Sequence, residues 1–175
     1  MVKVASYDVV FQEIPGEVTL ALNLSNCPCH CPGCHSPHLA EDIGEPLDEA
    51  LLDALIEKYS GLITCVCFMG GDADPAEVAR LAAHIKQLPI TSHQSPIKVA
   101  WYSGRQNAPD TFNYKLDGSL TSFNSQLSTF DFVKLGPYIE SLGGLKSPKT
   151  NQRLYKRVGD IWEDVTSVFW RKTFE

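Results

Sequence analysis

The chain alternates short apolar runs with longer amphipathic segments. Two strands are expected over residues 2–14 and 17–24, because a Pro15-Gly16 turn pair separates them and apolar residues recur at every second position of the later one. Three further short, largely apolar runs predict strands that are buried on both faces. These runs are residues 62–69, 97–102 and 131–135.

Two amphipathic segments between these runs predict α-helices. The first, over residues 48–59, has Asp48 at the N-cap position and apolar residues spaced three and four apart. The second begins at Asp74, with Pro75 in the first turn and Glu77 three residues after the cap. Both features of the second segment are typical of a helix start.

The order of these elements predicts the fold class. Residues 152–158 are expected to form a late strand, and residues 161–170 a return strand or a terminal helix after a Gly159-Asp160 turn. Strands that alternate with helices favour an α/β fold with a mostly parallel sheet. At 175 residues the chain is expected to form a single domain, residues 1–175.

Composition narrows the function classes. The chain has 15 basic and 21 acidic residues, a formal net charge of −6, which argues against broad binding to nucleic acid or to an anionic membrane. No apolar run approaches the roughly 20 residues of a membrane span. Because the N-terminus lacks the features of a secretory signal, the six cysteines predict a reducing, cytoplasmic location.

Four of the six cysteines fall within eight residues, Cys27-Pro28-Cys29-His30-Cys31-Pro32-Gly33-Cys34. Cys27, Cys31 and Cys34 have the spacing Cys-x3-Cys-x2-Cys, which lets three thiolates surround one face of an iron–sulfur cubane and leaves one iron without a protein ligand. Proline and glycine between the cysteines favour an irregular loop. Thiolate is a soft donor that suits iron–sulfur clusters, zinc or Cu(I).

Structural zinc and disulfides are the alternative interpretations of these cysteines. Disulfides are disfavoured because no secretory signal is visible and the chain is long enough to build a core without crosslinks. Zinc competes more strongly, since Cys29 supplies a fourth thiolate and three histidines lie nearby, His30, His35 and His38. Zinc sites, however, usually take two ligand pairs from separate segments. Spacing therefore favours the iron–sulfur cluster and leaves zinc open.

A second chemical signal, Met69-Gly70-Gly71-Asp72, lies between a predicted strand and a predicted helix. Ligands of open parallel sheets bind beyond the carboxyl ends of the strands, where glycines expose backbone groups and Asp72 offers a carboxylate to an ammonium. An ordinary strand-to-helix turn explains the same residues. Because the preceding strand leads into the cysteines, we expect both segments at one edge of the sheet.

Together, the Cys-x3-Cys-x2-Cys segment after an early strand and the Gly-Gly-acid turn after the next one resemble the radical S-adenosylmethionine superfamily. Within it, the chain is most similar to the small activating proteins of anaerobic ribonucleoside-triphosphate reductase, and the likeness spans roughly residues 18–169. The resemblance implies a partial (β/α) barrel, since the chain is too short for eight complete units. The narrower likeness rests on Cys31-Pro32-Gly33-Cys34, Gly70-Gly71-Asp72 and Thr150-Asn151-Gln152-Arg153.

The resemblance also implies the site residues. Cys27, Cys31 and Cys34 would hold a [4Fe-4S] cluster, whose open iron would be chelated by the amine and carboxylate of S-adenosylmethionine. The residues that would border this cofactor are Gly33, Cys34, His35, Gly70, Gly71 and Asp72, with the last three at its amino group. Ser103, at the end of a predicted strand, is a candidate contact for the ribose, with a plain turn as the alternative.

The implied activity is reductive cleavage of S-adenosylmethionine to a 5′-deoxyadenosyl radical, which takes a hydrogen atom from a glycine of a partner protein. The implied partners are the large subunit of anaerobic (class III) ribonucleoside-triphosphate reductase and a low-potential electron donor such as flavodoxin. Two alternatives stay open. One is a superfamily enzyme that acts on another glycyl radical enzyme or on a small molecule, and the other is a zinc-stabilised interaction module.

Two positions depart from the superfamily pattern. Gly33 stands where many members place an aromatic residue next to adenine, and His35 is expected to stack in its place. Cys29 is additional to the motif, and we interpret it as a bystander of the cluster. The two remaining cysteines, Cys65 and Cys67, share one face of a predicted strand and are expected in the core.

Residues 141–159 form a locally basic segment in this acidic chain. The segment has no acidic residue and five basic ones, Lys146, Lys149, Arg153, Lys156 and Arg157. A solvated loop is the simplest interpretation. The same charge makes the segment a candidate docking surface for an acidic partner or an electron donor.

Overall fold

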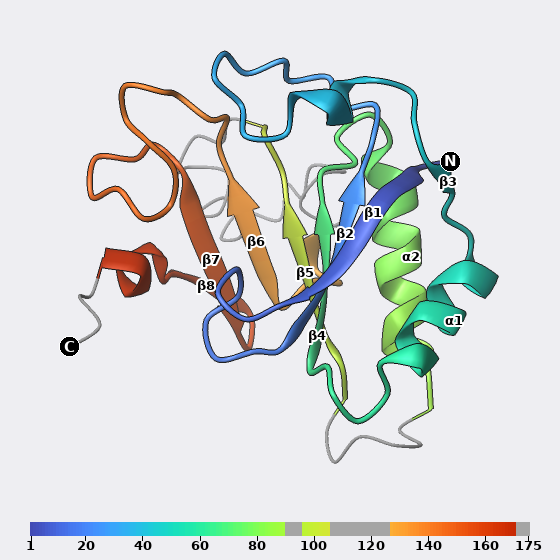
Figure 1. The fold of residues 1–175 in the computed structure, drawn as a ribbon. Coiled ribbons are helices and arrows are strands. Elements are labelled where there is room, and N and C mark those ends of the chain that lie inside the picture. The colour runs from blue at the N-terminus through green and yellow to red at the C-terminus, as the bar shows by residue number, and fades with distance from the viewer. Residues whose placement is uncertain (90–95, 106–126, 171–175) are drawn as a thin grey trace, which may run out of the picture.

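The computed structural model describes residues 1–89, 96–105 and 127–170. Within them, an eight-stranded sheet carries two α-helices on one face (Figure 1). The strands are β1 (Lys3–Val10), β2 (Thr19–Leu24), β3 (Glu45–Pro46), β4 (Cys65–Met69), β5 (Lys98–Tyr102), β6 (Phe132–Leu135), β7 (Arg153–Val158) and β8 (Ile161–Asp164). The helices are α1 (Glu49–Lys58) and α2 (Pro75–Gln87), with short 3-10 helices η1 (Pro37–Ala40) and η3 (Thr166–Trp170).

The sheet is mixed and has the strand order β3-β1-β2-β4-β5-β6-β7-β8. The central strands β2, β4, β5 and β6 pair in parallel, as expected from the sequence. The outer pairings are antiparallel, so the expectation of a mostly parallel sheet holds only for the centre. For two of these pairs, β1–β2 and β7–β8, the physical reason is that the strands are joined by connections too short for a parallel crossover. Curling of the sheet into a partial barrel stays a prediction.

The parallel register brings the carboxyl ends of four strands into one row. Asn23 of β2 pairs with Met69 of β4, Met69 with Tyr102 of β5, and Tyr102 with Lys134 of β6. We call this row the carboxyl edge of the sheet. The cysteine loop, residues 27–34, leaves β2 here and passes over the edge, as Figure 1 shows at the top of the view. The sequence prediction that this loop and the Gly-Gly-Asp turn share one edge is confirmed.

Alternate residues of each strand point to opposite faces and build two cores. On one face, large strand residues such as Phe68 and Trp101 pack with α1 and α2 residues such as Leu52 and Leu81. On the other face lies a smaller cluster, Ile14, Cys65, Cys67, Ala100, Phe132 and Leu154. Cys65 and Cys67 are fully buried, as predicted, and burial raises the pKa of both thiols, so both stay protonated and inert.

Both predicted helix starts are confirmed. Asp48 accepts a hydrogen bond from the N–H of Leu51 at 2.8 Å, and Asp74 accepts one from the N–H of Glu77 at 3.2 Å. Residues 161–170 contain both of the expected structures in succession, β8 and then η3. Among the helices that the structure describes, none has the length and apolar character needed to cross a membrane.

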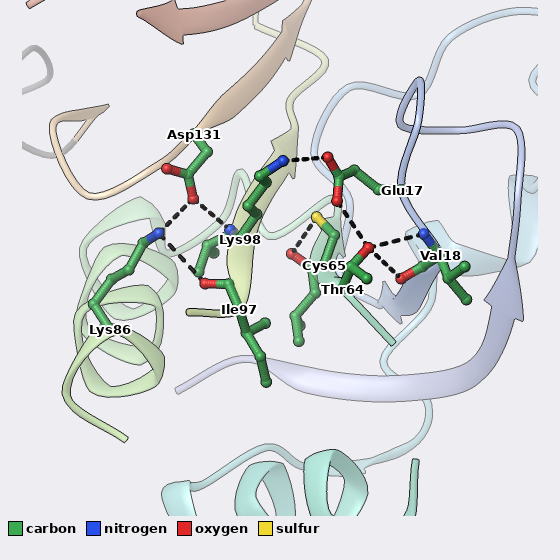
Figure 2. Close-up of polar contacts among 10 residues, drawn as sticks. Glu17, Val18, Thr64, Cys65, Lys86, Ile97, Lys98 and Asp131 are labelled. Carbon is green, nitrogen blue, oxygen red and sulfur yellow. Dashed lines mark hydrogen bonds and ion pairs between the residues drawn. The ribbon is translucent and has the colours of Figure 1, made fainter. Parts of the chain in front are cut away.

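The amino ends of the central strands are joined by ion pairs and hydrogen bonds (Figure 2). Asp131, just before β6, pairs with Lys86 of α2 and accepts a hydrogen bond from the Val99 N–H at 2.8 Å. Lys98, at the start of β5, pairs with Glu17. Because these charged groups satisfy one another, this end of the sheet serves stability, and the cysteine loop and the Gly-Gly-Asp turn lie at the other end.

Candidate functional site

Backbone hydrogen bonds close the cysteine loop at its base. The Cys27 N–H donates to the Leu39 carbonyl at 2.9 Å, and the Asn26 N–H donates to the Glu41 carbonyl at 3.2 Å. Asn26 and His30 have positive φ angles of 59° and 43°, which turn the chain sharply on both sides of Cys27. The irregular loop expected from the sequence is therefore confirmed, and backbone hydrogen bonds hold its start against residues 39–41.

The second half of the loop, Cys31-Pro32-Gly33-Cys34, is a tight turn. The Cys34 N–H donates to the Cys31 carbonyl at 3.1 Å, and Gly33 has a φ of +73°. Proline followed by a residue with positive φ is the pattern of a type II turn, which brings its first and last residues close together. The positive φ favours glycine at this position, since any other side chain would be strained there. The turn brings Cys31 and Cys34 close together, and their binding to one cluster stays a prediction.

The four loop cysteines are free and half-buried, so the disulfide alternative finds no support here. The Ser36 N–H donates to the sulfur of Cys34 at 3.4 Å, a bond of the kind that stabilises a coordinating thiolate. This set of soft, accessible donors fits an iron–sulfur cluster. Within residues 1–89, 96–105 and 127–170, no three His, Cys, Asp or Glu side chains already converge as a metal site. Metal binding and the final arrangement of such ligands are normally coupled.

Gly70 and Gly71 leave β4 with φ angles of +102° and +89°. A Cβ on Gly71 would lie 2.5 Å from Cγ2 of Val78 and 2.9 Å from Cδ1 of Leu24, so the packing of α2 against β2 requires glycine. The Gly70 carbonyl accepts a hydrogen bond from the indole of Trp101 at 2.8 Å. Backbone conformation and packing thus account for both glycines as an ordinary turn, and their contact with a cofactor stays a prediction.

Asp72 is 3% exposed and is bonded by the turn that follows β5. The Ser103 hydroxyl donates to Oδ1 of Asp72, and the Gly104 N–H donates to Oδ2 at 2.8 Å. The Arg105 guanidinium lies 3.6 Å from Oδ1 and donates to the Asp72 carbonyl at 3.0 Å. These bonds join the ends of β4 and β5 and fix the orientation of the carboxylate. Ser103 is fully buried, so its observed role is to hold Asp72, and its contact with a ribose is untested.

Cys29 also contacts Asp72. Its thiol donates to Oδ2 of Asp72 over 3.8 Å, and a Cβ on Gly104 would lie only 2.5 Å from the Cys29 sulfur. Burial, followed by the charges of Asp72 and Cys27, raises the pKa of Cys29 to about 12, so the thiol is protonated and able to donate. Sequence reasoning missed this contact because 43 positions separate the two residues.

Lys134 is a buried cation at the carboxyl edge, with 8% of its surface exposed. Its Nζ donates to the Gly136 carbonyl at 2.8 Å and to the Ser103 carbonyl at 3.5 Å. Burial lowers the pKa of Lys134 to about 8, while the charges of Asp72 and of the loop cysteines oppose this shift. Lys134 therefore places a positive group next to Asp72 and the cysteine loop.

The late Thr-Asn-Gln-Arg segment, residues 150–153, fastens the connection that follows β6. Asn151 Nδ2 donates to the Pro137 carbonyl at 2.9 Å, and Gln152 Nε2 donates to the Gly136 carbonyl at 3.4 Å. This second carbonyl also accepts the ammonium described above. The segment therefore holds the backbone that surrounds the buried Lys134 ammonium.

A cleft of about 320 Å³ opens beside the cysteine loop. It lies on the sheet face opposite α1 and α2, because Tyr102 points into it from β5. His35, which the sequence predicted to stack on adenine, borders this cleft, and its ring meets the Tyr138 ring edge-on with centroids 5.1 Å apart. The cleft is lined by Gln12, Glu13, His35, Tyr102, Gly144, Leu145, Lys146 and Phe169.

The basic segment 141–159 is partly neutralised in the folded chain. Arg153 lies 3.5 Å from Asp164, and Arg157 lies 3.8 Å from Asp131. These pairs connect β7 to β8 and to the start of β6. The segment therefore presents less free positive charge than its sequence indicates, and docking of an acidic partner on it stays a prediction.

Comparison with known proteins gives one family match. The family described as “4Fe-4S single cluster domain” matches residues 15–143, a span that includes the cysteine loop, the Gly-Gly-Asp turn and Lys134. The match supports an iron–sulfur cofactor in preference to zinc. No curated protein matches the chain, and no solved structure does.

Replacing Lys134 by methionine should remove a pH dependence from the stability of the metal-free chain. The folded pKa of Lys134 is about 8, whereas an unfolded lysine titrates near 10.4. The unfolded state therefore binds more protons between these values, and stability rises with pH. From pH 7 to 9.5, deprotonation of Lys134 should raise the free energy of unfolding of the wild type by about 2 kcal/mol. Lys134→Met lacks this contribution.

Urea unfolding at the two pH values measures this difference. Lys149→Met is the matched control, because Lys149 is exposed, and it should keep the wild-type pH dependence. An equal change in the free energy of unfolding between pH 7 and 9.5 in the wild type and in Lys134→Met would contradict the assigned pKa.

Proposed function

The chain belongs to the family of 4Fe-4S single cluster domains, and from this premise we propose that it is a radical S-adenosylmethionine activase that generates a glycyl radical on anaerobic (class III) ribonucleoside-triphosphate reductase. One observation supports the proposal above the others. The cysteine loop meets a buried carboxylate at the carboxyl edge, where the Cys29 sulfur lies 3.8 Å from Asp72. A cluster-binding loop and an acceptor for an ammonium therefore adjoin one another.

Each residue of the site has a role in this proposal. Cys27, Cys31 and Cys34 would hold the [4Fe-4S] cluster. When bound, the cluster supplies an open iron for the amine and carboxylate of S-adenosylmethionine and an electron for cleavage of its sulfonium. Asp72 orients the ammonium. Because the Ser103 hydroxyl already holds Asp72, the carboxylate needs no reorientation when the ligand arrives.

In this proposal, the cleft beside His35 is where the substrate segment of the partner protein approaches. Its volume of about 320 Å³ leaves room for only a short stretch of a partner chain or for a small molecule. It opens on the face that α1 and α2 leave uncovered, next to the cysteine loop. The partners in the proposal are the large reductase subunit and a low-potential electron donor such as flavodoxin.

Cys27→Ala, Cys31→Ala and Cys34→Ala should each abolish cluster assembly, because a site with three thiolates has no spare ligand. Anaerobic reconstitution followed by iron and zinc analysis should give about four irons per wild-type chain and far fewer in each variant. Cys29→Ala is the matched control from the same loop and should keep the wild-type iron content. Loss of iron in Cys29→Ala would show that the ligand set is wrong. Equimolar zinc without iron uptake would favour the zinc-stabilised interaction module.

Asp72→Ala should weaken S-adenosylmethionine binding by about tenfold or more, as expected for loss of a hydrogen bond to a charged group. Equilibrium dialysis of the reconstituted protein measures the affinity, and iron analysis of the same sample measures cluster assembly, which should fall less. Asp131→Ala removes a carboxylate from the opposite end of the sheet and should lower stability without weakening binding. Equal loss of iron and of binding in Asp72→Ala would assign Asp72 to the fold.

The activity itself is tested by radical transfer. The reduced, reconstituted protein is mixed with S-adenosylmethionine and candidate large reductase subunits. We expect 5′-deoxyadenosine together with the electron paramagnetic resonance doublet of a glycyl radical, and neither product with Cys34→Ala. Cleavage without a glycyl radical on any reductase subunit would support the alternative of another substrate. Absence of cleavage under these conditions would overturn the proposal.

A further inference from the structure

Asp72 has little free acceptor capacity for a ligand. An ionised carboxylate offers about four lone-pair positions. Oδ1 accepts the Ser103 hydroxyl and faces Arg105, whereas Oδ2 accepts the Gly104 N–H and the Cys29 thiol. An ammonium that binds Oδ2 must therefore displace one of the two groups that already donate to this oxygen.

Cys29 is the group that can be displaced at the lowest cost. A thiol is a weak donor, and its sulfur lies 3.8 Å from Oδ2, whereas an ammonium donates to a carboxylate at about 2.7–2.9 Å and far more strongly. The Ser103 hydroxyl is fully buried and also accepts the Arg105 N–H at 3.1 Å, so moving it would break a second bond. The Gly104 N–H belongs to the backbone. Cys29 needs only a rotation about one side-chain bond.

The space around Gly104 gives an independent reason to single out Cys29. A Cβ on Gly104 would lie 2.5 Å from the Cys29 sulfur and 3.6 Å from Oδ2 of Asp72. The sulfur therefore fills the room beside Oδ2 that the missing side chain leaves. A ligand group that approaches Oδ2 past Gly104 meets this sulfur first.

We propose that Cys29 occupies, in the ligand-free protein, the position on Asp72 that the ammonium of S-adenosylmethionine takes. The inference rests on the proposed function and extends it to a residue outside the cluster motif. Binding of the ligand rotates the thiol away from Oδ2, and the ammonium replaces it. Cys29 is thus a positioning residue, which keeps the buried carboxylate satisfied before binding and lowers the affinity for the ligand.

Ligand affinity tests the displacement. In equilibrium dialysis of the reconstituted protein, Cys29→Ala removes both the donor and the sulfur and should bind S-adenosylmethionine about threefold more tightly. Cys29→Val is the matched control, because it keeps bulk at this position without a donor, and its affinity should not exceed that of the wild type. Unchanged or weaker binding in Cys29→Ala overturns the inference alone. No binding by the wild type or either variant overturns the proposed function, and the inference with it.

Alkylation of Cys29 provides a second readout that does not depend on activity. In the reconstituted protein the cluster covers Cys27, Cys31 and Cys34, and burial protects Cys65 and Cys67, so mass spectrometry can follow Cys29 separately. Saturating S-adenosylhomocysteine, which carries the same ammonium and no sulfonium, should accelerate iodoacetamide labelling several-fold. An unchanged or slower rate with the ligand bound would overturn the inference.

Discussion

The parallel register of the four central strands is the constraint on which the rest of the site depends. Asn23, Met69, Tyr102 and Lys134 pair across β2, β4, β5 and β6, so the segments that follow these strands emerge together. Four stretches far apart in sequence thereby meet at the carboxyl edge. A shift by one residue in any pairing would turn every side chain of that strand to the opposite face and separate the groups.

The two ends of the sheet use polar groups for different purposes. At the amino ends, each charge has an opposite charge from a neighbouring element, as in the pair of Asp131 with Lys86, and the result is a stable boundary (Figure 2). At the carboxyl edge, Asp72 is held by neutral donors and by a half-exposed guanidinium, and the Lys134 ammonium is bonded to backbone carbonyls. Charges held in this way are oriented but not fully neutralised, which is compatible with the proposed binding of a charged ligand.

Much of the fold could be predicted from local patterns. The caps at Asp48 and Asp74 are signals within four residues, and the structure realises both. The type II turn at Pro32-Gly33 is equally local, and its positive φ gives a structural reason for glycine at this position. The direction of the edge strands was harder to predict, because it depends on which strand each one pairs with in the folded sheet.

By itself, the sequence determined the cysteine spacing, the strand-to-helix turn with its carboxylate and the family of 4Fe-4S single cluster domains to which the chain belongs. Only the tertiary structure decided which groups meet those residues. The contact of Cys29 with Asp72 and the burial of Lys134 arise from strands that are distant in sequence but adjacent in the sheet. Pairing of this kind depends on the energy of the whole core, and no local pattern of residues encodes it.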